Sequence, residues 1–144
     1  DKDNDGNTTG LSNFSSRKLF EPIGNTAINL PYKNKRLKDV HYWININGHT
    51  DYASQHHHCG ADMSGIYYVK TPKNSSYISF FDPRKIIWGN MFFIKEYEGY
   101  KESAMFDPQE GTVFLFPSFL EHSVTRNETH EHRISIAFNL FFER

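Results

Sequence analysis

Apolar and polar residues alternate with a period of two along several short stretches of the chain, and no stretch keeps a period of 3.6 over three helical turns. The alternating stretches are rich in aromatic and β-branched residues and are bounded by Gly, Pro, Asn and Asp, as is typical of strands. About eight short strands separated by turns predict an all-β fold, a sandwich or a jelly-roll barrel. The expected strands are residues 40–47, 63–70, 76–81, 91–97, 112–117, 122–125 and 133–142, with weaker candidates within 18–30.

Composition narrows the class of protein. The chain has 144 residues, which suffices for one domain with a substantial core, and 16% of them are aromatic. Basic and acidic residues nearly balance, 16 against 17, so no nucleic-acid partner is expected. A single Cys excludes an internal disulfide and fits a reducing, cytoplasmic setting. No apolar run approaches the roughly 18 residues that a membrane span needs, so no membrane partner is expected either.

The N-terminal residues 1–12 are polar and predict a flexible segment in front of a single domain over residues 13–144. The motif Asp-x-Asp-x-Asp-Gly at residues 1–6 matches the start of a calcium-binding loop. Ser12 stands where that loop needs its closing bidentate carboxylate, so a solvated end is preferred to a calcium site. No weight is given to the four N-glycosylation sequons, at Asn7, Asn13, Asn74 and Asn127.

Three consecutive histidines, His56 to His58, precede the only cysteine of the chain. In an extended segment, residues two apart point to the same side, so His56 and His58 can converge on one ion while His57 points away. Two neutral imidazoles suit Fe(II), Zn(II) or Cu(II), and a third ligand must come from elsewhere. The candidate is His122, which follows an apolar strand and a Pro-containing turn. For the triplet taken alone, a polar loop without metal is the alternative.

A polar pair opens the last predicted strand, residues 133–142, where Arg133 and Ser135 share the face opposite the bulky apolar residues. A guanidinium binds a carboxylate through two parallel hydrogen bonds, and a hydroxyl can add a third. The two residues therefore predict a carboxylate clamp on the wall of a small polar pocket. The alternative for Arg133 is a surface ion pair with Glu131 or Glu143.

The order of these pieces resembles that of the 2-oxoglutarate- and Fe(II)-dependent oxygenases, whose fold is a double-stranded β-helix, a cupin-like jelly-roll barrel with few short helices. The closer resemblance is to a bacterial and marine-phage branch with strings of the form HxH, SGvYYv, FPswlxH and RiSiafN. This chain has HHH, SGIYYV, FPSFLEH and RISIAFN, and the resemblance runs in the same order from Trp43 to Asn139.

The resemblance implies a hydroxylase that uses Fe(II), 2-oxoglutarate and O2 and releases succinate and CO2. The metal would be held by His56, His58 and His122, and the far carboxylate of 2-oxoglutarate by Arg133 and Ser135. The resemblance further places at the site Tyr68 and Asn47 for the cosubstrate and Asn45 for the substrate. It implies a peptidyl substrate, as in prolyl hydroxylases, or a small molecule.

One position departs from the usual superfamily pattern, because His58 stands where Asp or Glu is expected. Three neutral ligands would leave the ion its full charge, which strengthens its attraction for an anionic cosubstrate. If His58 were the first ligand, Gly60 would replace the carboxylate, as in halide-binding relatives, but the spacing to SGIYYV fits His56 better. Asp62 and Cys59 are weaker candidates, and Cys59 is expected to be a small buried residue.

Two other functions stay open at this point. A three-His cupin-like metalloenzyme would share the barrel and the metal but would not need a carboxylate clamp. A non-catalytic jelly-roll module for binding or assembly is the second, because one fold hosts many functions. Substrate selectivity is expected from loops at residues 31–39 and 82–106. No role is assigned to the remaining histidines, His41, His49, His130 and His132.

Overall fold

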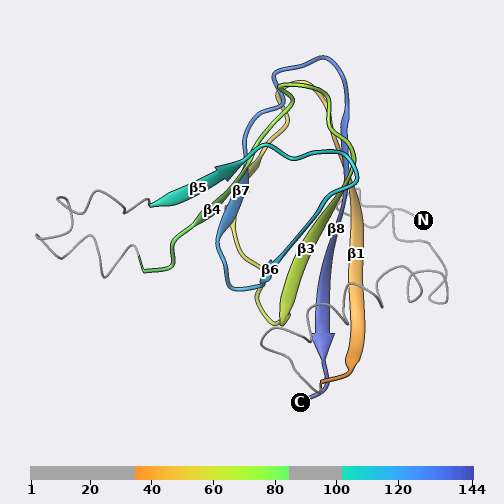
Figure 1. Cartoon of the computed structure of the whole chain (residues 1–144), viewed down its shortest axis with the longest axis vertical. Helices are drawn as coiled ribbons and strands as arrows, with labels where there is room; N and C mark the ends of the chain where they lie inside the picture. The colour runs from red at the N-terminus through yellow and green to blue at the C-terminus, as the bar shows by residue number, and fades with distance from the viewer. Residues whose placement is uncertain (1–34, 85–101) are drawn as a thin grey trace, which may run out of the picture.

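Two antiparallel four-stranded sheets make up the computed structural model, which describes residues 35–84 and 102–144 (Figure 1). The major sheet has the order β1-β8-β3-β6, with β1 (Leu37–Asn47), β8 (Arg133–Phe142), β3 (Met63–Lys70) and β6 (Val113–Pro117). The minor sheet has the order β2-β7-β4-β5, with β2 (Ala53–His56), β7 (His122–Val124), β4 (Ile78–Phe81) and β5 (Ser103–Phe106). The described residues include no helix, and so none that is long and apolar enough to cross a membrane.

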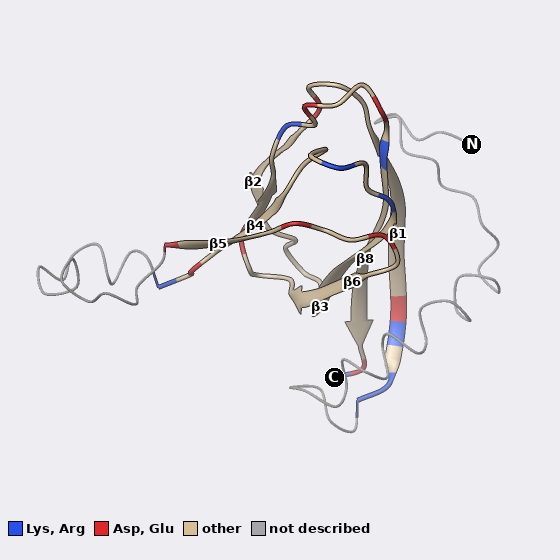
Figure 2. Cartoon of the chain, turned by 45° about the horizontal axis from the view of Figure 1, so that its top comes forward, with Lys and Arg blue, Asp and Glu red and all other residues tan. Residues whose placement is uncertain are grey.

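The strands alternate between the two sheets from β1 to β4 and again from β5 to β8. A chain that crosses from sheet to sheet in this way winds as a jelly roll. The predicted all-β, double-stranded β-helix fold is therefore confirmed. In Figure 2 the charged residues lie mainly at strand ends and in connecting segments, as expected for strands with much of their surface buried.

The predicted strand limits hold best where hydrophobic alternation is strong. β3 and β8 have the predicted limits, and β4, β6 and β7 differ from theirs by one or two residues. β1 begins at Leu37, earlier than predicted, because its ladder with β8 continues as far as Phe142. β5 lies within a predicted loop. All four of its residues are exposed, so its sequence has no alternation of buried apolar and exposed polar residues. The segment 1–12 and the strands expected within 18–30 and at 91–97 lie outside the described residues.

The two faces of β8 serve different purposes. One face carries Phe138, Leu140 and Phe142, which form a buried cluster with Met63 of β3. The opposite face points between the sheets, and its residues lie across the ladder from β1, with Asn47 opposite Arg133, Asn45 opposite Ser135 and Trp43 opposite Ala137. The second buried cluster lies between the sheets and consists of Ile66, Tyr68, Ile78 and Phe116. Register thus brings the predicted polar residues of β1 and β8 into the interior together.

Gly65→Ala is expected to destabilise the fold by about 1–3 kcal/mol through overpacking. Gly65 lies opposite Phe138 in the ladder, and an added Cβ would overlap the buried Phe138 ring and come within 3.0 Å of the Phe114 carbonyl oxygen. Urea unfolding of the metal-free protein measures the loss. Phe138→Leu should recover part of it in the double variant, and strictly additive losses would contradict this packing explanation.

Candidate functional site

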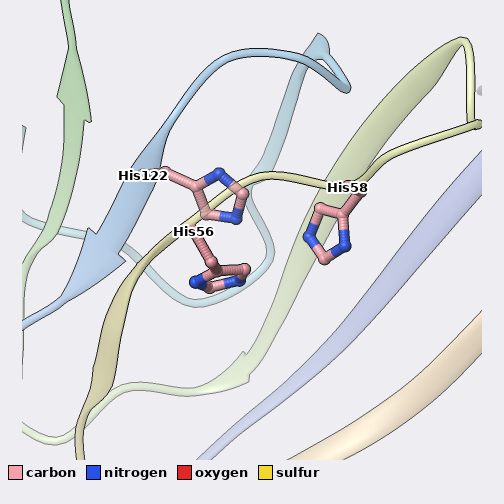
Figure 3. Close-up of side chains that lie close together, drawn as sticks. All are labelled: His56, His58 and His122. Atoms are coloured by element: carbon pink, nitrogen blue, oxygen red, sulfur yellow. The ribbon is translucent and has the colours of Figure 1, made fainter.

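The three predicted metal ligands lie together between the sheets, at one end of the minor sheet. His56 ends β2 and pairs across the ladder with His122, which begins β7, while His58 lies two residues beyond β2. One ring nitrogen from each of the three lies within 4.8 Å of the others, and Figure 3 shows the three imidazoles facing a common space. Such a cluster has the donors and the spacing to hold one transition-metal ion.

Two of these imidazoles are oriented by the main chain. Nδ1 of His56 lies 2.6 Å from the carbonyl oxygen of Ser54, and Nδ1 of His122 lies 2.9 Å from that of Leu120. A carbonyl oxygen only accepts, so each Nδ1 carries the proton and each Nε2 keeps a free lone pair. Main-chain partners of this kind fix the tautomer and the ring plane of a metal ligand. The local strand conformation therefore presents Nε2 of both residues to the cluster.

The neighbours of the cluster are engaged elsewhere. Nε2 of His57 lies 3.1 Å from Sγ of Cys59, and the Asp62 carboxylate accepts a hydrogen bond from the N–H of Phe142 at 2.8 Å. Cys59 is exposed, so the prediction of a buried cysteine was wrong. The physical reason is the turn that follows His58, in which Gly60 has a φ of 88° and both Cys59 and Gly60 are exposed.

Both partly enclosed ligands are held in the neutral form that binds a metal. Burial, together with the nearby imidazoles of His122, His56 and His57, lowers the pKa of His58 to about 4. Burial also lowers the pKa of His122, against the opposing effect of the hydrogen bond to Leu120. At neutral pH these rings are therefore neutral, and one nitrogen of each has a lone pair that can bind a metal without displacing a proton.

The metal-free protein is expected to lose stability as the pH falls from about 6.5 to about 4. His58 has its ordinary pKa of 6.5 when unfolded and about 4 when folded. Between these values the unfolded chain binds a proton that the folded chain does not. The free energy of unfolding therefore decreases as the pH is lowered. His122 acts in the same direction. Thermal midpoints across this range measure the slope. His58→Gln should flatten it and His57→Gln should not, so an unchanged slope in the first variant would contradict the assignment.

Arg133 is buried and has no acidic partner among the described residues. Its side chain is 1% exposed, and its Nη1 donates to Oδ1 of Asn47 at 3.2 Å. Its guanidinium lies 4.9 Å from the ring centre of Tyr68. Of the two ion-pair partners considered above, Glu131 instead contacts Nζ of Lys70 at 3.0 Å, and Glu143 is exposed while Arg133 is buried. The surface ion pair is therefore not formed, and the guanidinium faces the interior.

Four buried polar groups around this guanidinium have no hydrogen-bond partner within residues 35–84 and 102–144. They are Nε and Nη2 of Arg133, the Ser135 hydroxyl and the Tyr68 hydroxyl. Burial raises the pKa of Tyr68 to about 12, against the opposing effect of Arg133, so its hydroxyl stays protonated and can donate. Leaving such groups unpaired is costly, and a bound carboxylate would pair with several of them at once. This part of the site fits an anion with two oxygens.

One cavity of about 190 Å³ connects the histidines with Arg133. No acidic side chain is among the described residues that line it, so the charged forms in the lining are the guanidinium and any protonated histidine. Its walls come from both sheets and include Trp43, Asn45, Asn47, Tyr52, Ala53, His56, His58, Ile66, Ile78, Phe116, His122, Val124, Arg133 and Ala137. A metal at one end and an anionic group at the other would thus share one enclosed space.

The comparison with protein families agrees with this geometry. Residues 41–139 match the family described as "Putative 2OG-Fe(II) oxygenase", where 2OG is 2-oxoglutarate. The chain belongs to the 2OG-Fe(II) oxygenase family. The predicted family and its cofactors, Fe(II) and 2-oxoglutarate, are thereby confirmed at the level of the family. A comparison with curated proteins finds no match.

Several solved structures share the fold of this chain. SnoN, a non-heme α-ketoglutarate-dependent epimerase from nogalamycin biosynthesis, has a TM-score of 0.64 at 17% identity over 90% of this chain and 56% of its own. A Pseudomonas putida prolyl-4-hydroxylase has a TM-score of 0.63 at 14% identity over 95% of this chain and 70% of its own. Iron-bound HygX from Streptomyces hygroscopicus has a TM-score of 0.58 at 12% identity over 89% and 66%. The chain thus spans little more than half of SnoN.

Two aromatic residues of the cavity were not predicted. Trp43 lies on the same face of β1 as Asn45 and Asn47, and its ring centre is 5.6 Å from that of His58. The resemblance selected the two asparagines, and period-two alternation along the same strand would have added Trp43 to them. Tyr52 lies outside any strand and is 60% exposed, and nothing in its local sequence indicates that it lines the cavity.

Proposed function

We propose that this chain is a 2-oxoglutarate- and Fe(II)-dependent oxygenase that hydroxylates its substrate and releases succinate and CO2. The observation that carries the proposal is the buried Arg133, with unpaired donors and no acidic partner among the described residues, in the same cavity as three converging histidines. A three-His metalloenzyme without 2-oxoglutarate has no use for that guanidinium.

The chain's own residues divide the binding work between the two ends of the cavity. His56, His58 and His122 would hold Fe(II), the first and last through Nε2. Arg133 and Ser135 would hold the far carboxylate of 2-oxoglutarate. Tyr68 would donate to the same carboxylate, and Asn47 would orient the guanidinium through its hydrogen bond to Nη1.

When bound, Fe(II) and 2-oxoglutarate supply the activation of O2 and the oxidation of a C–H bond. The protein contributes position and shielding. Ile66, Ile78 and Phe116 are buried between the sheets and line the cavity, so they keep bulk water from its walls. Three neutral imidazoles leave the metal charge uncompensated by protein, which favours an anionic cosubstrate.

We assign the substrate to the side of the cavity formed by β1. Asn45 lies between Asn47, at the carboxylate end, and Trp43, whose ring lies beside His58. An amide and an indole in this arrangement suit a group with both polar and apolar parts, such as a peptidyl residue or a small cyclic molecule. The fold shared with a prolyl-4-hydroxylase is compatible with a peptidyl substrate.

Anaerobic titration with Fe(II) and then 2-oxoglutarate tests the proposal. We expect a weak metal-to-ligand charge-transfer band in the visible, followed by slow formation of succinate when O2 is admitted. Iron binding without this band would favour the cupin-like metalloenzyme. A folded protein that binds no iron would favour the non-catalytic module.

A further inference from the structure

Asn127 lies in the connection between β7 and β8, and its side chain is completely buried. Its main chain pairs with the turn that follows β1. The N–H of Asn127 donates to the Asp51 carbonyl at 2.9 Å, and its carbonyl accepts from the N–H of Thr50 at 2.8 Å. Two connections that are distant in sequence are therefore joined at this residue.

The side-chain amide of Asn127 is fully engaged. Nδ2 donates to the carbonyl oxygens of Asn47 at 3.0 Å and Glu131 at 2.8 Å. Oδ1 accepts from the N–H of Thr129 at 3.0 Å and from its hydroxyl at 2.8 Å. Both N–H groups and both lone pairs of the amide are thus satisfied, which fixes the conformation of this connection.

These bonds converge on the carboxylate end of the cavity. Asn47 is the last residue of β1, Arg133 is the first residue of β8, and the two lie opposite each other in the ladder. Asn127 holds the main chain of Asn47 directly, and the side chain of Asn47 holds Nη1 of Arg133. It also holds the carbonyl of Glu131, two residues before Arg133. The backbone on both sides of the clamp is therefore fixed by one amide.

We infer that Asn127 is a positioning residue for the carboxylate clamp, an inference that rests on the proposed function. An arginine side chain has many rotamers, and fixing it before the ligand arrives reduces the entropy cost of binding. Asn127 acts through Asn47, which sets the rotation of the guanidinium and leaves Nε and Nη2 free for a carboxylate. The ligand class concerned is a dicarboxylate or keto acid whose far carboxylate reaches Arg133.

The Asn-x-Thr pattern at residues 127–129 gains a structural meaning from the same contacts. Thr129 closes the turn onto the amide oxygen through both its N–H and its hydroxyl. The amide nitrogen is buried and used twice, so it is not presented for glycosylation in the folded protein. The residues of the sequon therefore have a structural role, because Thr129 holds the Asn127 amide in the orientation that binds Asn47.

The test compares Asn127→Ala with Thr129→Val, a matched change in the same turn that leaves the bond to Asn47 intact. The probe is 2-oxoglutarate, added anaerobically to the Fe(II)-loaded protein, and its Kd is read from the charge-transfer band. We expect Asn127→Ala to raise this Kd by about tenfold, the lower end of the range for residues that support a ligand-binding group, with Fe(II) affinity kept. Thr129→Val should lower the thermal midpoint of the metal-free protein and keep the wild-type Kd.

Two further variants test whether Asn127 acts on Arg133 through Asn47. In an Asn47→Ala background, Asn127→Ala should raise the Kd by less than it does alone, because the link to Arg133 is already missing. Asn127→Asp keeps the bonds from Thr129 but loses the amide donors, so it should also raise the Kd. It replaces the alanine variant in this test if that variant does not fold.

The outcomes separate the inference from the proposed function. Equal losses of thermal midpoint in Asn127→Ala and Thr129→Val, with the wild-type Kd in both, would overturn the positioning role and leave the oxygenase proposal intact. Additive effects of the Asn47 and Asn127 substitutions would overturn the route through Asn47. A wild-type protein that binds Fe(II) without forming the 2-oxoglutarate band would overturn both proposals.

Discussion

Arg133→Met is expected to abolish binding of 2-oxoglutarate while leaving the metal-free fold as stable as wild type or more stable. The guanidinium is the only described cation in the cavity lining besides protonatable histidines. Removing one partner of a desolvated charge pair costs roughly 2–5 kcal/mol, which is about 30-fold or more in Kd at 25 °C. The charge-transfer titration should therefore give no band at concentrations that saturate wild type.

Arg133→Met should not destabilise the metal-free fold, although it weakens binding, because the guanidinium is buried. In the metal-free protein Arg133 is 1% exposed, burial lowers its pKa, and its Nε and Nη2 are unpaired within the described part of the chain. An apolar side chain of similar length removes that desolvation cost, although it leaves Oδ1 of Asn47 without this donor. Replacement of buried charges by apolar residues is often neutral or stabilising by about 1–4 kcal/mol.

Arg84→Met is the matched control for this substitution. Arg84 is exposed and forms an ion pair with Asp82 at 2.7 Å, outside the cavity. It should change neither the Kd for 2-oxoglutarate nor, by more than a few tenths of a kcal/mol, the stability. Wild-type affinity in Arg133→Met would show that the clamp lies elsewhere. A large loss of stability would show that the guanidinium serves the fold.

The sequence was informative where one local rule decides the geometry. Period-two alternation was enough to place Arg133 and Ser135 on the interior face of β8, and to direct His56 and His58 toward one point. That both ends share one cavity follows from the pairing of β1 with β8 and of β2 with β7, which alternation within a single strand does not predict.

What the sequence did not provide depends on contacts between distant segments. The hydrogen bond from Asn127 to Asn47 spans 80 residues, and neither residue type predicts such a partner. That no acid of the described segments lies beside Arg133 is likewise a property of the packed interior, since Glu131 is only two residues away and pairs with Lys70. β5 was missed because an exposed edge strand has no buried face to impose alternation.

The three-histidine cluster raises the question of what the missing carboxylate changes. As a ligand, His58 would provide a neutral nitrogen where a carboxylate would remove one unit of the metal's charge. A more positive metal attracts the anionic cosubstrate more strongly, and the clamp adds a second positive group at the far end of the cavity. The cavity therefore matches a ligand with negative charge at both ends better than one with a single charge.

His58→Ala is expected to lower Fe(II) affinity by more than about 100-fold, beyond the range seen for residues that only support a ligand. The loss of one of three convergent nitrogens leaves two imidazoles, which rarely hold a transition metal alone. His57→Ala is the matched control in the adjacent position, because the His57 ring contacts Cys59 and is not in the cluster. It should keep the wild-type Fe(II) affinity.

His58→Asp separates the role of His58 as a ligand from the role of its charge. The carboxylate should retain Fe(II), and it should weaken 2-oxoglutarate binding because the metal centre becomes less positive. Calorimetry with Fe(II), followed by the 2-oxoglutarate titration, measures the two effects in turn. Full metal affinity in His58→Ala would remove His58 from the ligand set. Unchanged or tighter 2-oxoglutarate binding in His58→Asp would show instead that His58 binds the metal without the charge advantage argued for it, and that the clamp alone determines affinity for the cosubstrate.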